Sequence, residues 1–173
     1  MGVRGVQRWV LLILVSWMAG CAAPPAEVVG TFSGHPFSIE DQSPDVHFGR
    51  RTGSVLLVFS EINKDRLRTL TLSVPGALRL KEDVAYPLED GENGQISLEV
   101  SEGQLVVERD KEGKAFSTSV QTEFGLSVDG HVVFAALGAR IAGAFEAELD
   151  SGDTIRGSFD IELEEEDIEN PFR

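Results

Sequence analysis

Carboxylate clusters are the residues of this chain whose types and spacing best suit ligand chemistry. They gather at residues 89–94, 150–153 and 162–169, and carboxylate oxygens are ligands that calcium prefers. The first cluster does not match an EF-hand, because no glutamate follows at the required position. Solvated, charged turns are therefore the alternative. We expect no resident metal, and the candidate ligands, should calcium bind, are Asp90, Glu92, Asp150 and Asp153.

The three histidines could serve general acid–base chemistry, but their spacing gives no support to it. His35, His47 and His131 are far apart in the sequence. The sequence also contains no nucleophile elbow, no phosphate-binding loop, no dinucleotide fingerprint and no H-E-x-x-H zinc motif. We expect no catalytic residues and no cofactor. An envelope hydrolase stays as an alternative, and it would need a histidine beside a carboxylate and a serine or water.

The charge and cysteine counts exclude other classes of protein. The 173 residues include 15 Lys+Arg and 29 Asp+Glu, a net charge of −14. Nucleic-acid binding relies on clustered Lys and Arg, so we expect no nucleic-acid partner, whereas a basic protein partner stays open. The single cysteine, Cys21, cannot form an internal disulfide or a multi-thiolate zinc site. The oligomeric state is left open.

The first twenty residues have the pattern of a secretory signal. Arg4 and Arg8 form a positive start, and an apolar stretch runs from Trp9 to Ala19. This stretch is shorter than the roughly 20 apolar residues that span a bilayer. We therefore predict a cleaved signal peptide at residues 1–20.

The residues at the end of this leader resemble a lipobox. Met18-Ala19-Gly20-Cys21 is similar to the cleavage site of bacterial lipoproteins, although Met18 replaces the usual Leu, Val or Ile. The resemblance implies that Cys21 carries diacylglycerol, becomes the first residue after cleavage and is acylated on its amine. Two or more acyl chains hold a protein on a membrane permanently. A cysteine that happens to end a signal peptide, or an uncleaved anchor, is the alternative.

The same resemblance implies a location in the cell envelope. Ala22 follows Cys21, and the absence of Asp there is similar to lipoproteins of the outer membrane, if the host is a diderm bacterium. Removal of 20 residues leaves 153, with 13 basic and 29 acidic residues, a net charge of −16, and neither Trp nor Met. We predict a lipidated cysteine and Pro/Ala tether at residues 21–27, a β domain at 28–164 and an acidic tail at 165–173.

Apolar residues beyond the tether recur with period two. They are rich in Val, Ile, Phe and Thr and are interrupted by Gly, Asp, Asn and Pro, which is typical of antiparallel strands. We predict an all-β fold, an antiparallel sandwich or barrel of about eight or nine strands. The predicted strands are residues 28–33, 54–61, 67–74, 95–101, 104–109, 115–128, 131–137, 140–149 and 154–164.

Two short turns and one longer turn are predicted from these strands. Asp129-Gly130 and Glu102-Gly103 have the composition of two-residue hairpin turns, and the first would set Phe134 opposite Gly125. The third hairpin joins two copies of I-x-G-x-F-[ED]-x-E-L, at residues 141–149 and 155–163.

A register with residue 149 opposite 155 in this third hairpin would pair Phe145 with Phe159 and Glu148 with Arg156, and would set residue 141 opposite 163. Apolar residues also recur every four positions between Val133 and residue 149. A helix over this stretch is therefore the alternative.

The start and end of the β domain resemble a group of uncharacterised bacterial lipoproteins. Residues 30–37 read GTFSGHPF, similar to their G-x-F-x-G-x-P-F start, and two G-x-F strands near the end are similar to theirs. Members often carry cysteines in this domain, and this chain has none. The resemblance implies β architecture and surface attachment and carries no activity. We expect a membrane-anchored, non-catalytic binding or structural module, with a calcium-dependent adhesion or ligand-binding module as the alternative.

Overall fold

The computed structural model describes residues 26–49, 52–76, 79–89, 95–109, 112 and 114–163. Its regular structure is all β, as the sequence predicts, and the described residues contain no helix. None of them therefore offers a helix long and apolar enough to cross a membrane. The strands are β1 Ala26–Phe32, β2 His35–Asp41, β3 Asp45–Phe48, β4 Val55–Asn63, β5 Arg66–Val74, β6 Ala85–Glu89, β7 Ile96–Arg109, β8 Ala115–Ala136, β9 Arg140–Leu149 and β10 Thr154–Glu162.

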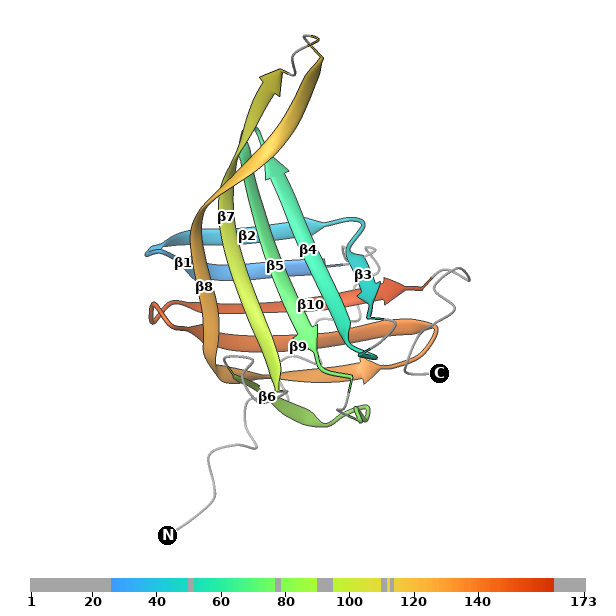
Figure 1. Cartoon of the computed structure of the whole chain (residues 1–173). Coiled ribbons are helices and arrows are strands. Elements are labelled where there is room, and N and C mark those ends of the chain that lie inside the picture. Colours follow the sequence, from blue (N-terminus) through green and yellow to red (C-terminus); the bar gives the residue numbers. More distant parts are fainter. Residues whose placement is uncertain are drawn as a thin grey trace, which may run out of the picture.

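The strands form one sheet that folds into two layers. The strand order is β2-β1-β10-β9-β8-β6-β7-β5-β4-β3, with an additional β8–β7 pairing. The first layer contains β2, β1, β10, β9, β6 and the C-terminal half of β8; the second contains β3, β4, β5, β7 and the N-terminal half of β8. Strands of the two layers cross one another (Figure 1). All pairings are antiparallel except β6–β7.

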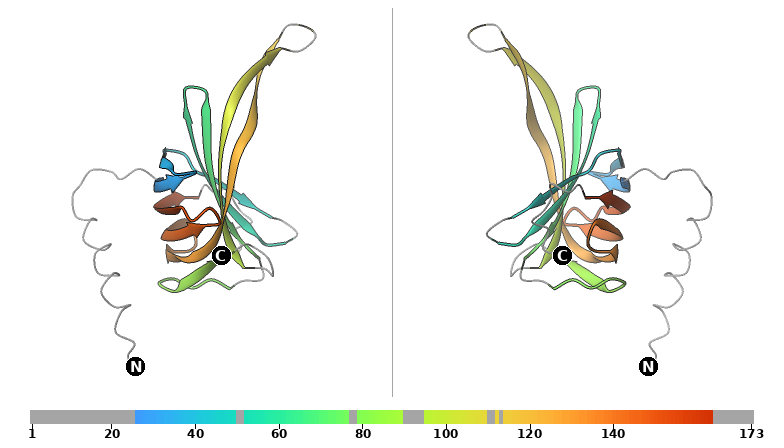
Figure 2. Two further views of the ribbon diagram at one scale, coloured as in Figure 1. Left: turned by 90° about the vertical axis from the view of Figure 1, so that its left-hand side faces the viewer. Right: turned by 90° about the vertical axis from the view of Figure 1, so that its right-hand side faces the viewer.

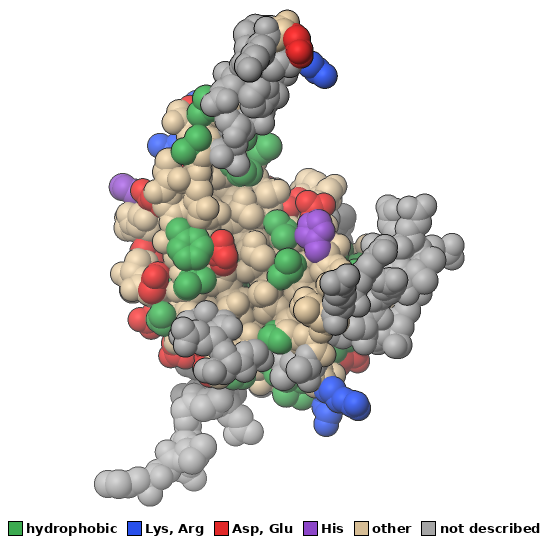
Figure 3. Space-filling model, viewed as in Figure 1, with side chains coloured by type: hydrophobic (Ala, Val, Ile, Leu, Met, Phe, Trp, Pro, Cys, Tyr) green, Lys and Arg blue, Asp and Glu red, His purple; other side chains and the backbone are tan. Residues whose placement is uncertain are grey.

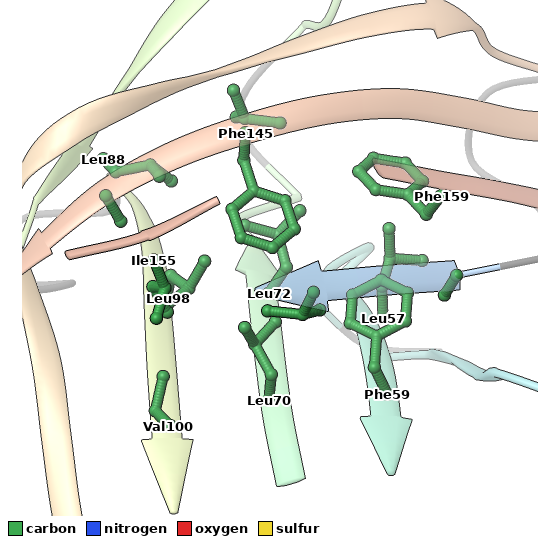
Figure 4. Packing of buried hydrophobic residues seen from close by; sticks show 14 of the residues in the cluster. Leu57, Phe59, Leu70, Leu72, Leu88, Leu98, Val100, Phe145, Ile155 and Phe159 are labelled. Carbon is green, nitrogen blue, oxygen red and sulfur yellow. The ribbon is translucent and has the colours of Figure 1, made fainter. Parts of the chain in front are cut away.

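The core lies between the layers and is made of alternate residues from each strand. Phe159 of β10 contacts Phe59 of β4 and Phe134 of β8, with ring centroids 5.8 Å and 5.9 Å apart. Burying one such side chain is worth roughly 1.5–3 kcal/mol. Figure 4 shows how residues of both layers meet there: Leu57, Phe59, Leu70, Leu72, Leu98 and Val100 face Phe145, Ile155 and Phe159.

A buried carboxylate joins the layers where β2 approaches β4. Asp41, at the end of β2, accepts hydrogen bonds from the backbone N–H groups of Ser60, at 2.6 Å, and Ser43, at 2.8 Å. Arg68 of β5 donates to the carbonyl oxygen of Ser38 and lies over the Phe37 ring, 5.4 Å from its centroid. These contacts hold the side of the sandwich where no β2–β4 backbone ladder forms.

The hairpin made by the two sequence repeats is confirmed, but its predicted register is wrong by two residues. Phe145 stands opposite Gly157, and Phe159 stands opposite Gly143. A Cβ atom at Gly157 would lie 2.6 Å from Cζ of Phe145, and one at Gly143 would lie 2.7 Å from Cζ of Phe159. Each ring therefore covers the glycine of the partner strand. Because the slip is two residues, the core face is unchanged, but Arg156 pairs with Glu146 and not with Glu148.

The two predicted short turns are wrong, because both dipeptides lie inside long strands. β7 continues through Glu102-Gly103, where the register with β8 shifts. β8 continues through Asp129-Gly130, and a register shift there accompanies its passage between layers. Gly130 uses its positive φ of 132° in this irregularity instead of in a reversal.

The strand pairings also decide the remaining predictions about these segments. Phe134 stands opposite Gly143, and Phe32 is the ring that covers Gly125. The helix alternative for residues 133–149 is also wrong, since residues 133–136 end β8 and residues 140–149 form β9. Three short strands, β2, β3 and β6, were not predicted. The signal peptide, Cys21 and the acidic tail lie outside the described residues.

Candidate interaction surface

The three histidines lie on three different strands. His35 begins β2, His47 lies in β3 and His131 lies in β8, and all three are exposed. Two shallow surface depressions, of about 350 Å³ and 250 Å³, have linings without histidine. Among the described residues, no three His, Cys, Asp or Glu side chains come together as a metal site.

Two of the four candidate calcium ligands hold backbone groups of neighbouring strands. The carboxylate of Asp150 accepts from the N–H of Leu126 at 3.3 Å, and its own N–H donates to the Leu126 carbonyl at 2.8 Å. The carboxylate of Asp153 accepts from the N–H of Gly34 at 3.3 Å and from the hydroxyl of Ser151 at 2.9 Å. The other two candidates, at positions 90 and 92, lie outside the described residues.

Asp153 therefore fastens the turn between β9 and β10 to the turn between β1 and β2. Desolvation raises the pKa of its carboxyl, but hydrogen bonds from Ser151, Thr31, Gly34 and Ser33 together outweigh desolvation and hold this pKa below its ordinary value of 3.8. The ionised form is thus favoured by the fold. We call these two turns, residues 33–34 and 150–153, the distal turns.

The outer side of the first layer is strongly acidic. Arg140 forms an ion pair with Asp160 there, and Arg156 stands opposite Glu146. The carboxylates outnumber these two guanidinium groups, so the layer presents negative charge to solvent. We call this surface the acidic face, and its carboxylates on the described strands are Glu27, Glu40, Asp129, Glu146, Glu148, Asp160 and Glu162.

The outer side of the second layer is nearly uncharged. Over β3, β4, β5, residues 96–106 of β7 and residues 120–126 of β8, where the structure describes the side chains, the outward titratable groups are Asp45, His47 and Glu99. We call this surface the neutral face. Its hydroxyl side chains are Ser60, Thr69, Thr71, Ser73, Ser97 and Ser101, and its apolar side chains are Leu56, Val58, Ile62, Leu67, Phe124 and Leu126.

Figure 3 views the neutral face directly: separate hydrophobic patches lie among uncharged polar surface, with few acidic groups. Phe124 is 49% exposed and Ile62 is 63% exposed. Depletion of charged residues, together with aromatic and aliphatic side chains, distinguishes the centres of protein interfaces from ordinary surface. The neutral face is therefore the candidate interaction surface of this domain.

Sequence reasoning did not find the neutral face. Its residues come from five strands, and each strand contributes only alternate positions. Leu56 and Leu57 are adjacent in the sequence, yet Leu57 is in the core and Leu56 faces outward. A weak signal was present, since the outward positions of β5 from Leu67 to Ser73 are uncharged in an acidic chain. Comparison of the chain with protein-family models, with curated proteins and with solved structures gave no significant match.

Proposed function

We propose that this chain is a lipid-anchored, non-catalytic binding or structural module of the cell envelope, which contacts its partner through the neutral face. The proposed binding role rests on one observation, the difference in charge between the two outer faces. Among the side chains that the structure describes, the acidic face holds seven carboxylates against two guanidinium groups and His131, whereas the neutral face holds two carboxylates and one histidine.

The anchor in this proposal is Cys21, and the sequence supports it through the leader and the lipobox-like residues before it. β1 begins at Ala26, five residues after Cys21. Five extended residues span at most about 18 Å, so the domain would stay close to the bilayer. Ala26 pairs with Phe159 near the end of β10, and the distal turns lie at the other end of these strands. The distal turns would therefore point away from the attachment point.

The charge of the mature chain supports the same arrangement. A net charge of −16 on the residues after the leader is repelled by anionic lipid headgroups. The acidic face would stay solvated, and the neutral face would meet a partner without the cost of burying unpaired charges. For a diderm host, Ala22 favours the outer membrane as the location.

The attachment is tested by labelling cells with palmitate analogues and separating their membranes. We expect the wild-type chain to take up label and to sediment with membranes. Cys21→Ala should lose both properties, because the acylated thiol is absent. Label uptake by Cys21→Ala would contradict the anchor, whatever the role of the domain.

The contact surface is tested separately, with a photo-reactive amino acid placed in intact cells. Position Thr71 lies in the middle strand of the neutral face, and Ser158 is its exposed counterpart on the acidic face. We expect a discrete cross-linked product from position 71 and none from position 158. The reverse result would move the contact to the acidic face and favour a basic protein partner.

A further inference from the structure

Asp129-Gly130 lies where β8 passes from one layer to the other, in an irregular stretch of the strand. Figure 2 views the molecule from two sides, with β8 descending along the second layer toward the strands of the first. The register with β9 shifts between Ser127 and Asp129 and leaves Val128 as an extra residue, which is 50% exposed. Such a bulge interrupts the regular ladder, so fewer ladder contacts fix the backbone around Asp129.

The carboxylate of Asp129 contacts the backbone nitrogen of the residue that follows it. The N–H of Gly130 donates to Oδ1 of Asp129 over 2.7 Å, and the carboxyl carbon Cγ is one bond away from that oxygen. A bond between this nitrogen and Cγ would close a five-membered ring. Contact between two reacting groups removes much of the entropic cost of joining them. Glycine has no Cβ atom to hinder the approach, and Gly130 has a φ of 132°.

The same carboxylate is open to water. Asp129 is exposed, and together with Val128 and residues 87–89 it lines the shallow depression of about 250 Å³. Water can therefore reach a ring formed at this position and open it. The depression also leaves space for a change in the course of the backbone.

Other aspartates in turns of this domain have their carboxylates held by distant parts of the chain. Asp150 accepts from the N–H of Leu126, and Asp153 accepts from the N–H of Gly34. Neither is followed by glycine. Among the described residues, Asp129 is the one aspartate that precedes a glycine, and its contact is with the nitrogen of that glycine.

We propose that Asp129 converts to isoaspartate in the folded chain and that this loosens the passage of β8 between the layers. The nitrogen of Gly130 bonds to Cγ of Asp129, and one carboxyl oxygen leaves as water with the amide proton and the carboxyl proton. Water then adds to the main-chain carbonyl carbon of Asp129, and the bond from that carbon to the nitrogen breaks. The chain now runs through Cγ, with no net change in atoms and no oxidant.

The product lengthens the backbone by one carbon between two buried residues. Ser127 and Val132 are both fully buried. The hydroxyl of Ser127 accepts from the N–H of Leu98 at 3.0 Å and donates to the carbonyl of Glu89 at 2.9 Å. The extra carbon must be absorbed between Ser127 and Val132, where Val128 is already an extra residue. We therefore expect the isoaspartate form to lose part of the pairing between β8 and β9.

Ageing of the purified full chain in detergent tests the proposal. The protein is kept for several days at physiological temperature and pH, and fresh and aged samples are digested with trypsin. Cleavage after Lys114 and Arg140 releases residues 115–140, in which Asp129 is the only aspartate and no asparagine occurs. Electron-transfer fragmentation distinguishes isoaspartate from aspartate in this peptide. We expect isoaspartate to accumulate at position 129 faster than at positions 150 and 153, which lie together in the peptide 141–156.

Two controls separate the geometry of the fold from the general chemistry of Asp-Gly. Asp129→Glu keeps the charge but would need a larger ring, so it should form no isomer at this position. Ageing in guanidinium chloride keeps the sequence and removes the fold. We expect the folded chain to form isoaspartate at position 129 at least as fast as the unfolded chain, because the fold keeps the nitrogen beside the carboxyl group. The isoaspartate form, separated by chromatography, should melt several degrees below the unmodified form.

Three results would overturn the proposal. One is isoaspartate at position 129 in the unfolded chain and not in the folded chain, because the fold would then protect this site. Another is equal accumulation at positions 129, 150 and 153 of the folded chain. The third is an identical Tm for the isoaspartate and unmodified forms, which would show that the passage of β8 is not loosened.

Discussion

Replacing Gly157 by alanine should destabilise the domain through one defined collision. The new methyl group would lie 2.6 Å from Cζ of Phe145 and 2.7 Å from the backbone oxygen of Glu27. Real Cβ atoms do not approach other heavy atoms so closely, so either the ring or β1 must move. Phe145 is buried, with 4% of its surface exposed, and has little space into which to turn.

The size of the effect follows from the packing on both sides of Gly157. Overpacking a well-filled core costs about 1–3 kcal/mol. For a domain of this size, about 2 kcal/mol lowers Tm by roughly 4–8 °C. The neighbouring exposed change Ser158→Ala is the matched control and should stay within about 0.5 kcal/mol of the wild type.

The assay is urea denaturation followed by far-ultraviolet circular dichroism, with Gly157→Ala, Phe145→Leu and the double variant measured together. Phe145→Leu alone should destabilise through a cavity. In the double variant the smaller side chain leaves room for the methyl group, so its loss of free energy should fall short of the sum by about 1 kcal/mol. The shortfall is partial because the contact with Glu27 remains. Full additivity, or a Gly157→Ala protein as stable as the wild type, would refute the reasoning.

The remaining predictions concern the turns, the strand junction and calcium. Because the pKa of Asp153 is lowered in the folded state, its stabilising contribution is present above its ordinary pKa of 3.8 and is lost as pH falls through the folded pKa. Urea titrations should therefore show stability declining below about pH 4, and Asp153→Asn should make this decline shallower; an unchanged slope would contradict the turn contact. Ser127→Ala should cost about 1–3 kcal/mol in the same assay, since the Ser127 hydroxyl accepts from the buried N–H of Leu98 at 3.0 Å and donates to the Glu89 carbonyl at 2.9 Å. Calcium at millimolar concentration should leave Tm unchanged in a thermal melt, and a clear rise would favour the calcium-dependent alternative.

Alternation of apolar residues was enough to predict the fold class, because strand faces depend on a period of two. It was not enough to distinguish a turn from an irregular strand. Asp129-Gly130 suits a hairpin turn and also a bulge, since both use a glycine with positive φ. Only the partners of the flanking residues decide between them, and Ser127 and Val132 both pair with β9.

The register of the repeat hairpin could not be predicted from the sequence, for a related reason. A slip of two residues keeps Phe145 and Phe159 in the core, so hydrophobic alternation cannot detect it. The deciding contact is each ring against a glycine, Gly157 or Gly143, across the hairpin. The short strands were missed because the proline and charges that protect β2 also weaken its strand pattern.

The candidate surface could be predicted only in part from the sequence. The acidic clusters can be identified in the sequence alone. The structure adds that two of their members, Asp150 and Asp153, accept hydrogen bonds from backbone N–H groups of neighbouring segments. The neutral face required the layer assignment, since Thr71 and Val58 are neighbours only through the β4–β5 register.

The passage of β8 through both layers determines how the domain unfolds. β8 pairs with β7 in the second layer and with β9 in the first, so neither layer keeps its full set of neighbours when the other is lost. The two layers are thus coupled through the continuous backbone of β8. Local unfolding of one layer should therefore destabilise the other layer. Amide exchange at Leu72 in the second layer and at Ile161 in the first should report one common opening free energy, the behaviour of a single cooperative unit.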